Sequence, residues 1–344
     1  MISLLVVNFR AAALAANAIR TAREAASSPL QVVVVDNSCD ARESDALRGI
    51  ADTLIVSETN RGYAGGINAG RGACAGEVIV ISNPDVTFAP QSLDLLANAL
   101  DRNVAVAGPA LFWDDAHQWH LPPGDLLTAP QKLDLIFASR SRTWRAQRDR
   151  RRFQQRVAFW SLDRTAHVRM LSGAVMAVRA RDFDDLDGFD ERFPLYFEET
   201  DFLRRVAQRR KRIAYVPAAR CRHIYNQSAA QVSEISAARY SESEWKYLEK
   251  WNGPWLARTL KRLERRARLQ PAPLVGGGLK PALRSEDVIT EASPLANFET
   301  AAGYFGHATD VPPEVRASLG GSELFVRVVA RSTAEVLATY KITS

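Results

Sequence analysis

The chain carries a dense group of acids, Glu198, Glu199 and Asp201, directly behind the aromatic residues of the segment ERFPLYFEETDFLR. Carboxylates this close together repel one another, so the group is costly unless cations, amides or a substrate proton use it. Apolar residues at helical spacing follow, which places the acids at the start of an amphipathic helix. An acid at the start of a helix can cap it or interact with the positive end of the helix dipole, and each such interaction stabilises the helix by under about 1 kcal/mol. These effects explain one or two of the acids but not three.

A carboxylate in this position could act as a general base in the transfer of a sugar. In an inverting transfer, an ionised carboxylate takes the proton of the acceptor hydroxyl as that oxygen attacks the anomeric carbon. We choose Glu199 as the base, with Asp201 second and Glu198 third.

Two further polar side chains, Asp85 and His223, follow predicted strands. Asn83-Pro84-Asp85 ends the apolar run at 77–82, and Mg²⁺ or Mn²⁺ needs such an oxygen ligand when it is shared with a diphosphate. His223 lies just past a later strand, at the same predicted edge of the sheet. We predict that both bind the metal ion. The alternatives, a turn in which Asp85 caps the next helix and an interior histidine, stay open.

Other residues near strand ends are predicted to bind a nucleotide donor. The motif NRGYAGGINAG is rich in glycine, which lets backbone amides approach a phosphate closely at the start of a helix. It lacks the GxGxxG spacing of a nicotinamide site. Asp36 could accept hydrogen bonds from a base or a ribose, or could form an Asx-turn. The full predicted set is Asn8, Asp36, Asn60, Gly62, Gly65, Gly66, Asn68, Asn83 and Gly173.

The elements that must position these residues alternate between strand and helix. Apolar runs predict strands at 2–7, 32–35, 54–56, 77–82, 104–108, 170–178 and 213–217. Helical patterns cover 11–25, 92–100 and 201–210, and a helix rich in small residues develops within 62–76. This alternation predicts a parallel α/β sheet whose ligands bind beyond the carboxyl ends of the strands. A last strand is expected at 323–329.

Composition restricts the classes of protein that fit. The chain has 344 residues, 47% hydrophobic and 24% charged, which is ordinary globular make-up. No apolar run is long enough for a secretion signal or a membrane span, so we expect a cytoplasmic protein. Cys39, Cys74 and Cys221 are too few and too widely spaced for a disulfide framework or a zinc cluster.

The net charge of +6 is concentrated in two arginine-rich tracts. The first tract, Arg140 to Arg156, holds eight arginines and one acid, and the second, Arg258 to Arg268, reads RTLKRLERRAR. Either tract could meet anionic lipid, a diphosphate or nucleic acid, or could simply be a solvated helix face. Trp251, Trp255, Leu256, Leu260 and Leu263 lie among the basic residues of the second tract, a pattern that suits a helix at a membrane interface.

Taken together, the ordered motifs resemble family 2 glycosyltransferases, in particular the rhamnosyltransferase-like enzymes of bacterial surface polysaccharides. The motifs are VVNFR, VVDNS, NRGYAGGINAG, SNPDV, LSGAVMAVR and GFDERFPLYFEETDF, followed by the strand-end His223. The resemblance covers about residues 1–250. It implies a GT-A fold, a nucleotide-diphosphate sugar donor, Mg²⁺ or Mn²⁺, and inversion at the anomeric carbon.

The resemblance also implies roles for individual residues. Asp36 matches the nucleoside contact, Asp85 the metal-binding acid, Glu199 the base and His223 a later metal or diphosphate ligand. The sequence departs from the family pattern in having a single acid after Asn83-Pro84, and in having Glu where Asp is frequent at the base position, so Glu199 and Asp201 could exchange roles.

The expected organisation is a catalytic domain at 1–250 with an insertion at 112–162 over the active face. A basic amphipathic helix at 251–270 and a linker with a C-terminal extension at 271–344 follow. The expected partners are dTDP-rhamnose or a similar donor, a glycan or polyprenyl-diphosphate-linked acceptor, and the anionic inner leaflet of the membrane. Two other hypotheses are a basic nucleic-acid-binding protein, which lacks a recognisable binding motif, and a non-catalytic scaffold.

Overall fold

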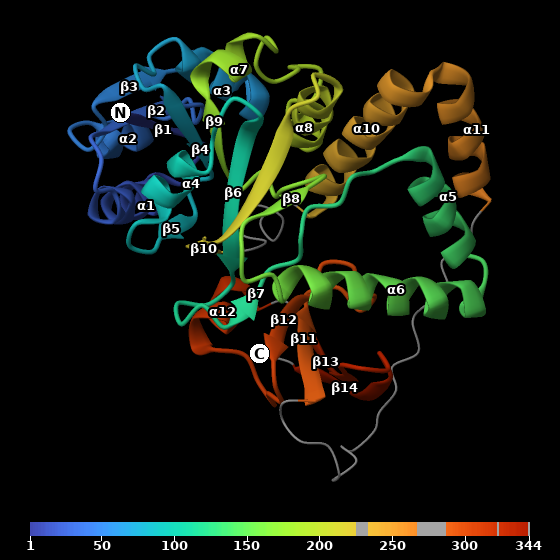
Figure 1. Ribbon diagram of the computed structural model, residues 1–344. Helices are drawn as coiled ribbons and strands as arrows, with labels where there is room; N and C mark the ends of the chain where they lie inside the picture. The colour runs from blue at the N-terminus through green and yellow to red at the C-terminus, as the bar shows by residue number, and fades with distance from the viewer. Residues whose placement is uncertain (225–232, 267–286, 322, 343–344) are drawn as a thin grey trace.

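The computed structural model describes residues 1–224, 233–266, 287–321 and 323–342 (Figure 1). The strands are β1 (Ile2–Asn8), β2 (Leu30–Asp36), β3 (Thr53–Val56), β4 (Val78–Ser82), β5 (Val86–Phe88), β6 (Val104–Phe112), β7 (Trp119–His120), β8 (Ala166–Val168), β9 (Val175–Arg179), β10 (Arg212–His223), β11 (Val288–Ser293), β12 (Ala302–Phe305), β13 (Leu324–Ala330) and β14 (Val336–Ile342). The helices are α1 (Ala12–Ala25), α2 (Ala41–Leu47), α3 (Gly62–Arg71), α4 (Ser92–Asn98), α5 (Ala129–Ala138), α6 (Arg142–Trp160), α7 (Ala180–Asp184), α8 (Glu198–Gln208), α10 (Ser233–Asn252), α11 (Pro254–Arg265) and α12 (Pro313–Ser318).

The N-terminal part is a mixed sheet in the order β3-β2-β1-β4-β9-β6, with β10 beside β6. The neighbours β3, β2, β1 and β4 are parallel, β10 is parallel to β6, and β9 runs antiparallel between β4 and β6. Apolar runs without polar alternation suit such strands because both faces are covered. The predicted fold class, a mostly parallel sheet flanked by helices, is confirmed.

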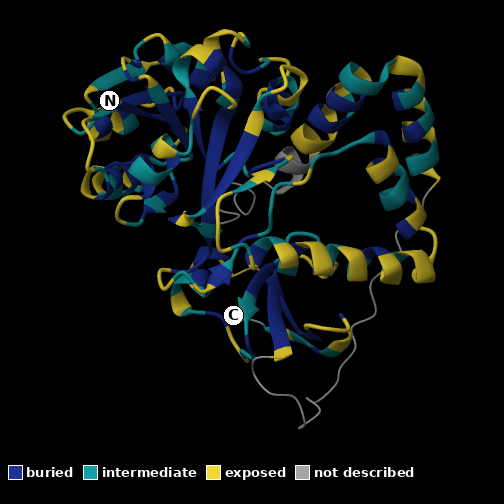
Figure 2. Ribbon diagram, in the orientation of Figure 1, coloured by how far each residue is buried: buried dark blue, intermediate teal, exposed yellow. Residues whose placement is uncertain are grey.

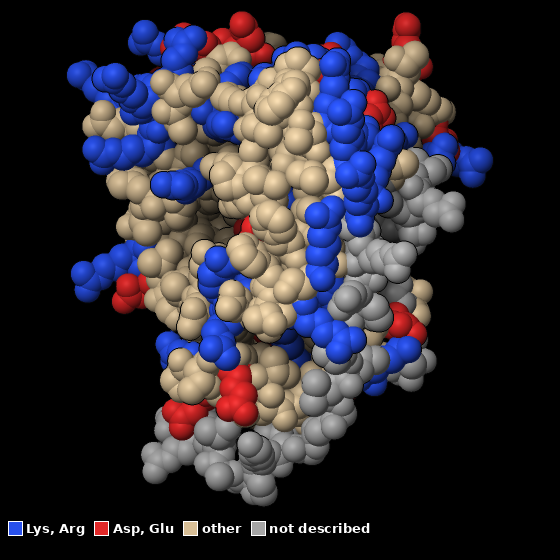
Figure 3. Space-filling model, turned by 90° about the vertical axis from the view of Figure 1, so that its right-hand side faces the viewer, with Lys and Arg blue, Asp and Glu red and all other residues tan. Residues whose placement is uncertain are grey.

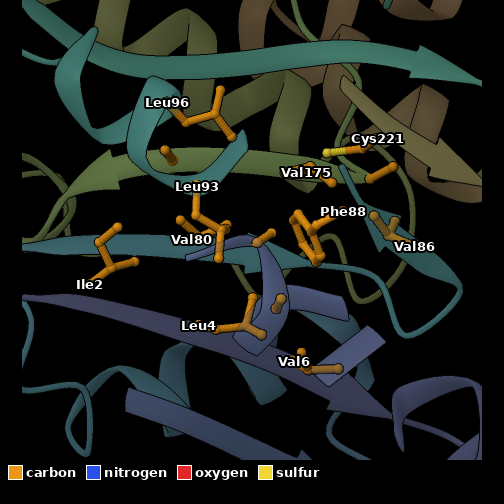
Figure 4. Close-up of a cluster of buried hydrophobic side chains, with 14 of the residues drawn as sticks. Ile2, Leu4, Val6, Val80, Val86, Phe88, Leu93, Leu96, Val175 and Cys221 are labelled. Carbon is orange, nitrogen blue, oxygen red and sulfur yellow. The ribbon is translucent and has the colours of Figure 1, made fainter. Parts of the chain in front are cut away.

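Side chains of β1 show how the two faces are filled. Successive residues of a strand point to opposite faces, so Leu4 and Val6 pack with α1 and α4 on one side. Figure 4 shows this side of the core. Leu5 and Val7 face the other side, where α3 and α8 pack. The sheet is therefore held between two helical layers, and its strand ends are fixed in place.

The C-terminal part forms an antiparallel sheet that continues the first one. β11 pairs with β12 and β13, and β13 pairs with β14. β12 pairs with β7, which meets the end of β6 where Phe112 lies opposite His120. Only β13 corresponds to a strand expected from the sequence. The linker expected at 269–280 lies outside the described residues.

Helix α6 carries the first arginine tract and joins the two parts of the molecule. Its outer side is exposed (Figure 2), but Arg148, Arg152 and Arg156 are turned toward acids. Arg148 and Arg152 pair with Glu299, and Arg156 donates to the fully buried Glu291 at 2.9 Å from Nε and 2.5 Å from Nη2. Neither a purely solvated face nor a free phosphate-binding surface describes this tract, because three of its eight arginines pair with acids of the C-terminal part.

Helices α5, α10 and α11 pack together, and α10 also contacts α8 and the loop before it. Lys132 of α5 is buried, and its Nζ atom lies 2.8 Å from a carboxylate oxygen of Glu244 in α10 and 2.6 Å from one of Glu264 in α11. Leu260 is fully buried against α5, and Leu256 and Leu263 join the same cluster. These leucines therefore do not face a membrane, and the expected interfacial helix is corrected on this point.

Residues 112–162, predicted to form an insertion over the active face, instead contact three different parts of the molecule. α5 packs on α11, and α6 packs on the C-terminal sheet. The segment before α5 approaches the predicted site: a Cβ atom on Gly124 would lie 2.4 Å from the Leu171 carbonyl oxygen, and Leu127 packs with Phe197. Among the described helices, none combines the length and the apolar run needed to cross a bilayer.

Candidate functional site

Asp85 and His223 are brought together by a short antiparallel ladder. β5 begins one residue after Asp85 and runs against β10, so that Val86 lies opposite His223. The amide of Ile224 donates to the Asp85 carbonyl oxygen at 3.0 Å. As a result, Nε2 of His223 lies 3.2 Å from Oδ1 of Asp85, and the Asp85 residue is only 9% exposed.

The three acids occupy the first turn of α8, behind two unusual backbone conformations. Tyr196 and Phe197 have φ angles of 67° and 69°, a region that aromatic residues rarely adopt. Such strain persists only where the surrounding structure enforces it, and it is concentrated at functional sites. The turn leads directly into Glu198, which is 6% exposed and whose Oε2 atom has no hydrogen-bond partner among the described residues.

Glu199 rests on the loop that precedes β9. A Cβ atom on Gly173 would lie 3.0 Å from Cγ of Glu199, so only glycine leaves room for this side chain without a shift. The neighbouring residue Ala174 accepts a hydrogen bond from the Asn83 amide at 2.9 Å, which extends the ladder between β4 and β9. Glu199 and the segment that ends at Asp85 therefore both contact the loop at residues 173–174.

Glu198, Glu199 and Asp85 all act on one common neighbour, the phenol of Tyr63. Burial raises the pKa of Glu199 above that of an ordinary glutamate, and burial together with the charge of Glu199 raises the pKa of Glu198 well above it. Burial, Glu198, Glu199 and Asp85 together raise the pKa of the Tyr63 phenol well above its usual value. Two acids that interact in this way do not ionise independently, so one of them holds a proton more tightly than the other.

Tyr63 is a site residue that sequence reasoning did not select. Its hydroxyl is buried without a hydrogen-bond partner in the described part of the chain, which is rare for a group that can both donate and accept. Its amide donates to the Pro194 carbonyl oxygen at 2.6 Å, which ties the start of α3 to the loop before α8. The sequence feature that could have identified it is that Tyr63 is the one aromatic residue of the motif NRGYAGGINAG.

Asp201 lies in the same turn but is engaged by basic groups. Arg205 Nε donates to its Oδ2 atom at 2.7 Å. Its Oδ1 atom lies 2.5 Å from Lys250 Nζ and accepts from Trp251 Nε1 at 2.9 Å. Because both oxygens are occupied and the residue is fully buried, this arrangement favours an anchor for α8 rather than a free base.

Asn8 and Asp36 lie at the adjacent carboxyl ends of β1 and β2. Asn8 Nδ2 donates to Asp36 Oδ1 at 3.0 Å, and Ser44 donates to Oδ2 at 2.6 Å. The Ser38 amide also donates to Oδ1, which makes the Asx-turn that the sequence left open. Although burial opposes ionisation, hydrogen bonds from Ser44, Ser38 and Asn8 hold the pKa of Asp36 below its ordinary value. Asp36 lies two strands from β4, about 10 Å across the sheet.

Most residues of the glycine-rich motif make close packing contacts or hydrogen bonds with neighbouring segments. Asn60 accepts from the Gly62 amide at 2.9 Å, and Gly62, with φ of 72°, lies against Pro194. Gly66 has no room for a side chain beside β1. Asn68 accepts from the Phe189 amide at 2.9 Å and so holds the loop before α8. The remaining predicted contact, Gly65, lies between Arg61 and Glu191.

The residues present fit a divalent cation that is shared with a substrate. Asp85 and His223 offer a carboxylate oxygen and an imidazole nitrogen side by side. No cluster of three or more His, Cys, Asp or Glu side chains suited to a metal ion occurs within the described ranges. Two protein ligands are few for a cation bound by protein alone. They suit Mg²⁺ or Mn²⁺ that also takes substrate phosphates, because these ions are commonly bound in that way.

Comparison with known proteins identifies a family and relatives of this chain. The model of the family described as "Glycosyltransferase like family 2" matches residues 1–242. The N-acetylglucosaminyl-diphospho-decaprenol L-rhamnosyltransferases of two Mycobacterium tuberculosis strains, CDC 1551 / Oshkosh and ATCC 25618 / H37Rv, are each 25% identical over 261 residues. Each alignment covers 68% of this chain and 79% of the relative.

Solved structures give more distant matches. A mannosyltransferase from Pyrobaculum calidifontis, in complex with GDP-Man and Mn²⁺, has a TM-score of 0.45 at 18% identity and covers 76% of this chain and 73% of its own. S. aureus TarS 1-349 in complex with UDP has a TM-score of 0.42 at 13% identity, with 73% and 70% covered.

Proposed function

Because the chain belongs to the glycosyltransferase-like family 2, we propose that it transfers a sugar from a nucleotide-diphosphate donor to an acceptor hydroxyl with inversion at the anomeric carbon. The donor we propose is dTDP-rhamnose, and the acceptor is a lipid-linked or growing cell-surface glycan. The name of the mycobacterial relatives, N-acetylglucosaminyl-diphospho-decaprenol L-rhamnosyltransferase, supports rhamnose as the sugar and a lipid-linked acceptor.

The observation that carries this proposal is the placement of Glu199 against Gly173, one residue from the Ala174 carbonyl that binds Asn83. A base must lie beside the donor sugar, and the donor diphosphate must lie beside the cation ligands, so the two groups must share one pocket. The effect of Glu199 and Asp85 on the same phenol supports such an arrangement.

The two acids at the start of α8 take different roles in this proposal. Glu199 in its ionised form accepts the proton of the acceptor hydroxyl. Glu198, which is more deeply buried and has the more strongly raised pKa, keeps its proton and leaves Glu199 as the charged member of the pair. Asp201 holds the helix in place through Arg205 and Lys250.

Asp85 and His223 would hold Mg²⁺ or Mn²⁺ together with the donor diphosphate. When bound, the cation supplies positive charge that stabilises the nucleoside diphosphate as it leaves. Asp36 takes part in the nucleoside pocket by fixing the turn at Asn37 and Ser38 through its own hydrogen bonds.

Turnover of nucleotide sugars by the purified full chain tests the proposal. With Mn²⁺ or Mg²⁺ and a polyprenyl-diphosphate-linked acceptor, dTDP-rhamnose should be consumed faster than UDP- or GDP-activated sugars, with release of dTDP. Nuclear magnetic resonance of the product should show the anomeric configuration opposite to that of the donor. A product that retains the donor configuration, or no turnover of any nucleotide sugar, would contradict the proposal.

A further inference from the structure

The outer face of α11 carries cations that no described acid neutralises. Five exposed basic side chains project from this helix and its C-cap: Arg258, Lys261, Arg262, Arg265 and Arg266. None of the five forms an ion pair within the described parts of the chain. Residues three, four and seven positions apart share one face of a helix, so Arg258, Arg262 and Arg265 form a row.

The opposite face of the same helix is already occupied. Leu260 is buried against α5, and Glu264, the single acid of the helix, pairs with Lys132 at 2.6 Å. The helix therefore has one apolar face that belongs to the protein core and one cationic face that meets solvent. Figure 3, which looks onto this side of the molecule, shows Lys and Arg side chains gathered in a continuous band.

Exposed aromatic rings lie at both ends of this helix. Trp255, in its first turn, is 78% exposed, although burial of an indole is strongly favourable. At the other end, Arg140 donates to the Leu263 carbonyl oxygen at 2.5 Å and brings the turn between α5 and α6 alongside. Phe137 and Trp144 flank that turn with ring centroids 5.3 Å apart, 43% and 39% exposed. Aromatic rings beside basic side chains are typical of surfaces that enter the headgroup region of a bilayer.

We propose that this surface, which consists of Trp255, the five α11 cations, Phe137 and Trp144, docks on an anionic lipid bilayer. The cations meet lipid phosphates, and the rings enter the boundary between headgroups and acyl chains. Single-stranded nucleic acid is a weaker match because its bases stack on aromatic rings inside a positively charged groove, whereas these side chains project from the outside of a helix.

This inference goes beyond sugar transfer, since it concerns a surface made by α11 and the α5–α6 turn and not by the residues at the strand ends. It differs from the surface expected from the sequence, because the leucine stripe of α11 is covered by α5. If the proposed acceptor is lipid-linked, the docked enzyme would be held at the surface where that acceptor lies.

Vesicle binding by the full chain, measured without donor or acceptor, tests the proposal independently of turnover. Co-sedimentation uses vesicles of equal parts phosphatidylglycerol and phosphatidylcholine at low salt. The wild-type protein should bind these vesicles and not phosphatidylcholine alone, and binding should weaken as salt screens the surface potential. The triple variant Arg258→Gln, Arg262→Gln, Arg266→Gln should bind roughly 100-fold more weakly, at about fivefold per cation.

Two controls make the result decisive. The triple variant Arg102→Gln, Arg164→Gln, Arg169→Gln removes the same charge from other exposed positions and should bind like the wild type. Trp255→Ser should bind several-fold more weakly and should reduce the blue shift of tryptophan fluorescence on mixing with vesicles. Thermal melting of each variant checks that the fold is kept.

Equal loss of binding in both triple variants, undiminished binding in the α11 variant, or equal binding to neutral vesicles would overturn the proposal. Retention of a single-stranded oligonucleotide through the α11 cations, without vesicle binding, would assign the surface to nucleic acid instead.

Discussion

Nε2 of His223 lies 3.2 Å from Oδ1 of Asp85, although the two residues come from distant parts of the chain. The contact follows from the pairing of β5 with β10, which sets Val86 opposite His223. The pair lies at the carboxyl end of the sheet, where parallel α/β proteins bind their ligands.

His223→Gln should weaken Mn²⁺ binding in the presence of a nucleoside diphosphate by at least about 10-fold, because an imidazole ligand is lost. Isothermal titration of Mn²⁺ into the protein with dTDP measures this directly. His167→Gln removes an exposed histidine on β8 and should bind Mn²⁺ normally. Equal affinity in His223→Gln and the wild type would remove His223 as a ligand.

Chelation of metal ions should likewise stop turnover by the wild type.

Gly173→Ala should lower kcat more than it raises KM for the donor. Its methyl group would lie 3.0 Å from Cγ and 3.4 Å from Cδ of Glu199, so the carboxylate must move by a few tenths of an ångström. Steady-state kinetics measure the effect, which should be about 10-fold or less, because a misplacement of about 1 Å can cost on the order of 100-fold. Gly72→Ala is the matched control, since nothing lies within 4 Å of its Cβ position. Equal, small effects in the two variants would show that Glu199 has no strict positional requirement.

The pH profile of kcat should have an acid limb set by Glu199. Because burial raises its pKa, Glu199 takes up a proton at a pH above about 4.3, the value of an ordinary glutamate. A protonated carboxylate cannot act as the base, so kcat should rise with pH through this shifted value. The test measures kcat at saturating donor and Mn²⁺ over roughly pH 4 to 8, a range in which a buried glutamate can titrate. The residual activity of His223→Gln should show the same fall in kcat at low pH. A kcat that stays constant down to the pKa of an ordinary glutamate would contradict the assignment of this limb to Glu199.

Glu291→Gln should destabilise the fold by about 3–5 kcal/mol at neutral pH, because Arg156 and Arg327 would be left buried without a negative partner. Although burial opposes ionisation, these two guanidinium groups hold the pKa of Glu291 below its ordinary value. Its contribution to stability is therefore present above the unfolded-state pKa of about 4.3 and is lost as pH falls through the folded-state pKa.

Urea unfolding at several pH values measures this effect. The difference in unfolding free energy between the wild type and Glu291→Gln should narrow as the solution is acidified. Glu335→Gln, an exposed acid between β13 and β14, is the control and should change stability by less than about 0.5 kcal/mol. A pH-independent difference would mean that lost packing, rather than lost charge, is responsible.

The N-terminal fold could be predicted because its signals are local. The valine run of β2 and the apolar runs of β1 and β4 mark strands buried on both faces, and small residues and helical spacing mark α1 and α3. The same local signals brought Asp36, Asp85 and His223 to strand ends. By contrast, β11 and β12 were not expected, because their pairing depends in part on partners distant in the chain, such as β7 for β12. β14 was not expected either, although it pairs with the neighbouring β13.

Roles that depend on three-dimensional neighbours could not be predicted. Asp201 stayed the second candidate for the base because the sequence does not show that Lys250 and Trp251, on α10, reach its carboxylate. Likewise, the sequence left open whether the arginines of α6 form a surface for anions or a solvated face, because Glu291, the partner of Arg156, lies on a strand that was not expected. In both cases the missing information was which helix packs against which part of the molecule.

A direct comparison of two variants tests the central claim that Glu199 is the base. With dTDP-rhamnose, Mn²⁺ and a lipid-linked acceptor, Glu199→Gln should lose on the order of 100-fold or more in kcat, while its affinity for donor, measured by titration, stays within about twofold. Asp201→Asn should instead lower the melting temperature. Full activity in Glu199→Gln, or loss of donor binding equal to the loss of activity, would contradict the account.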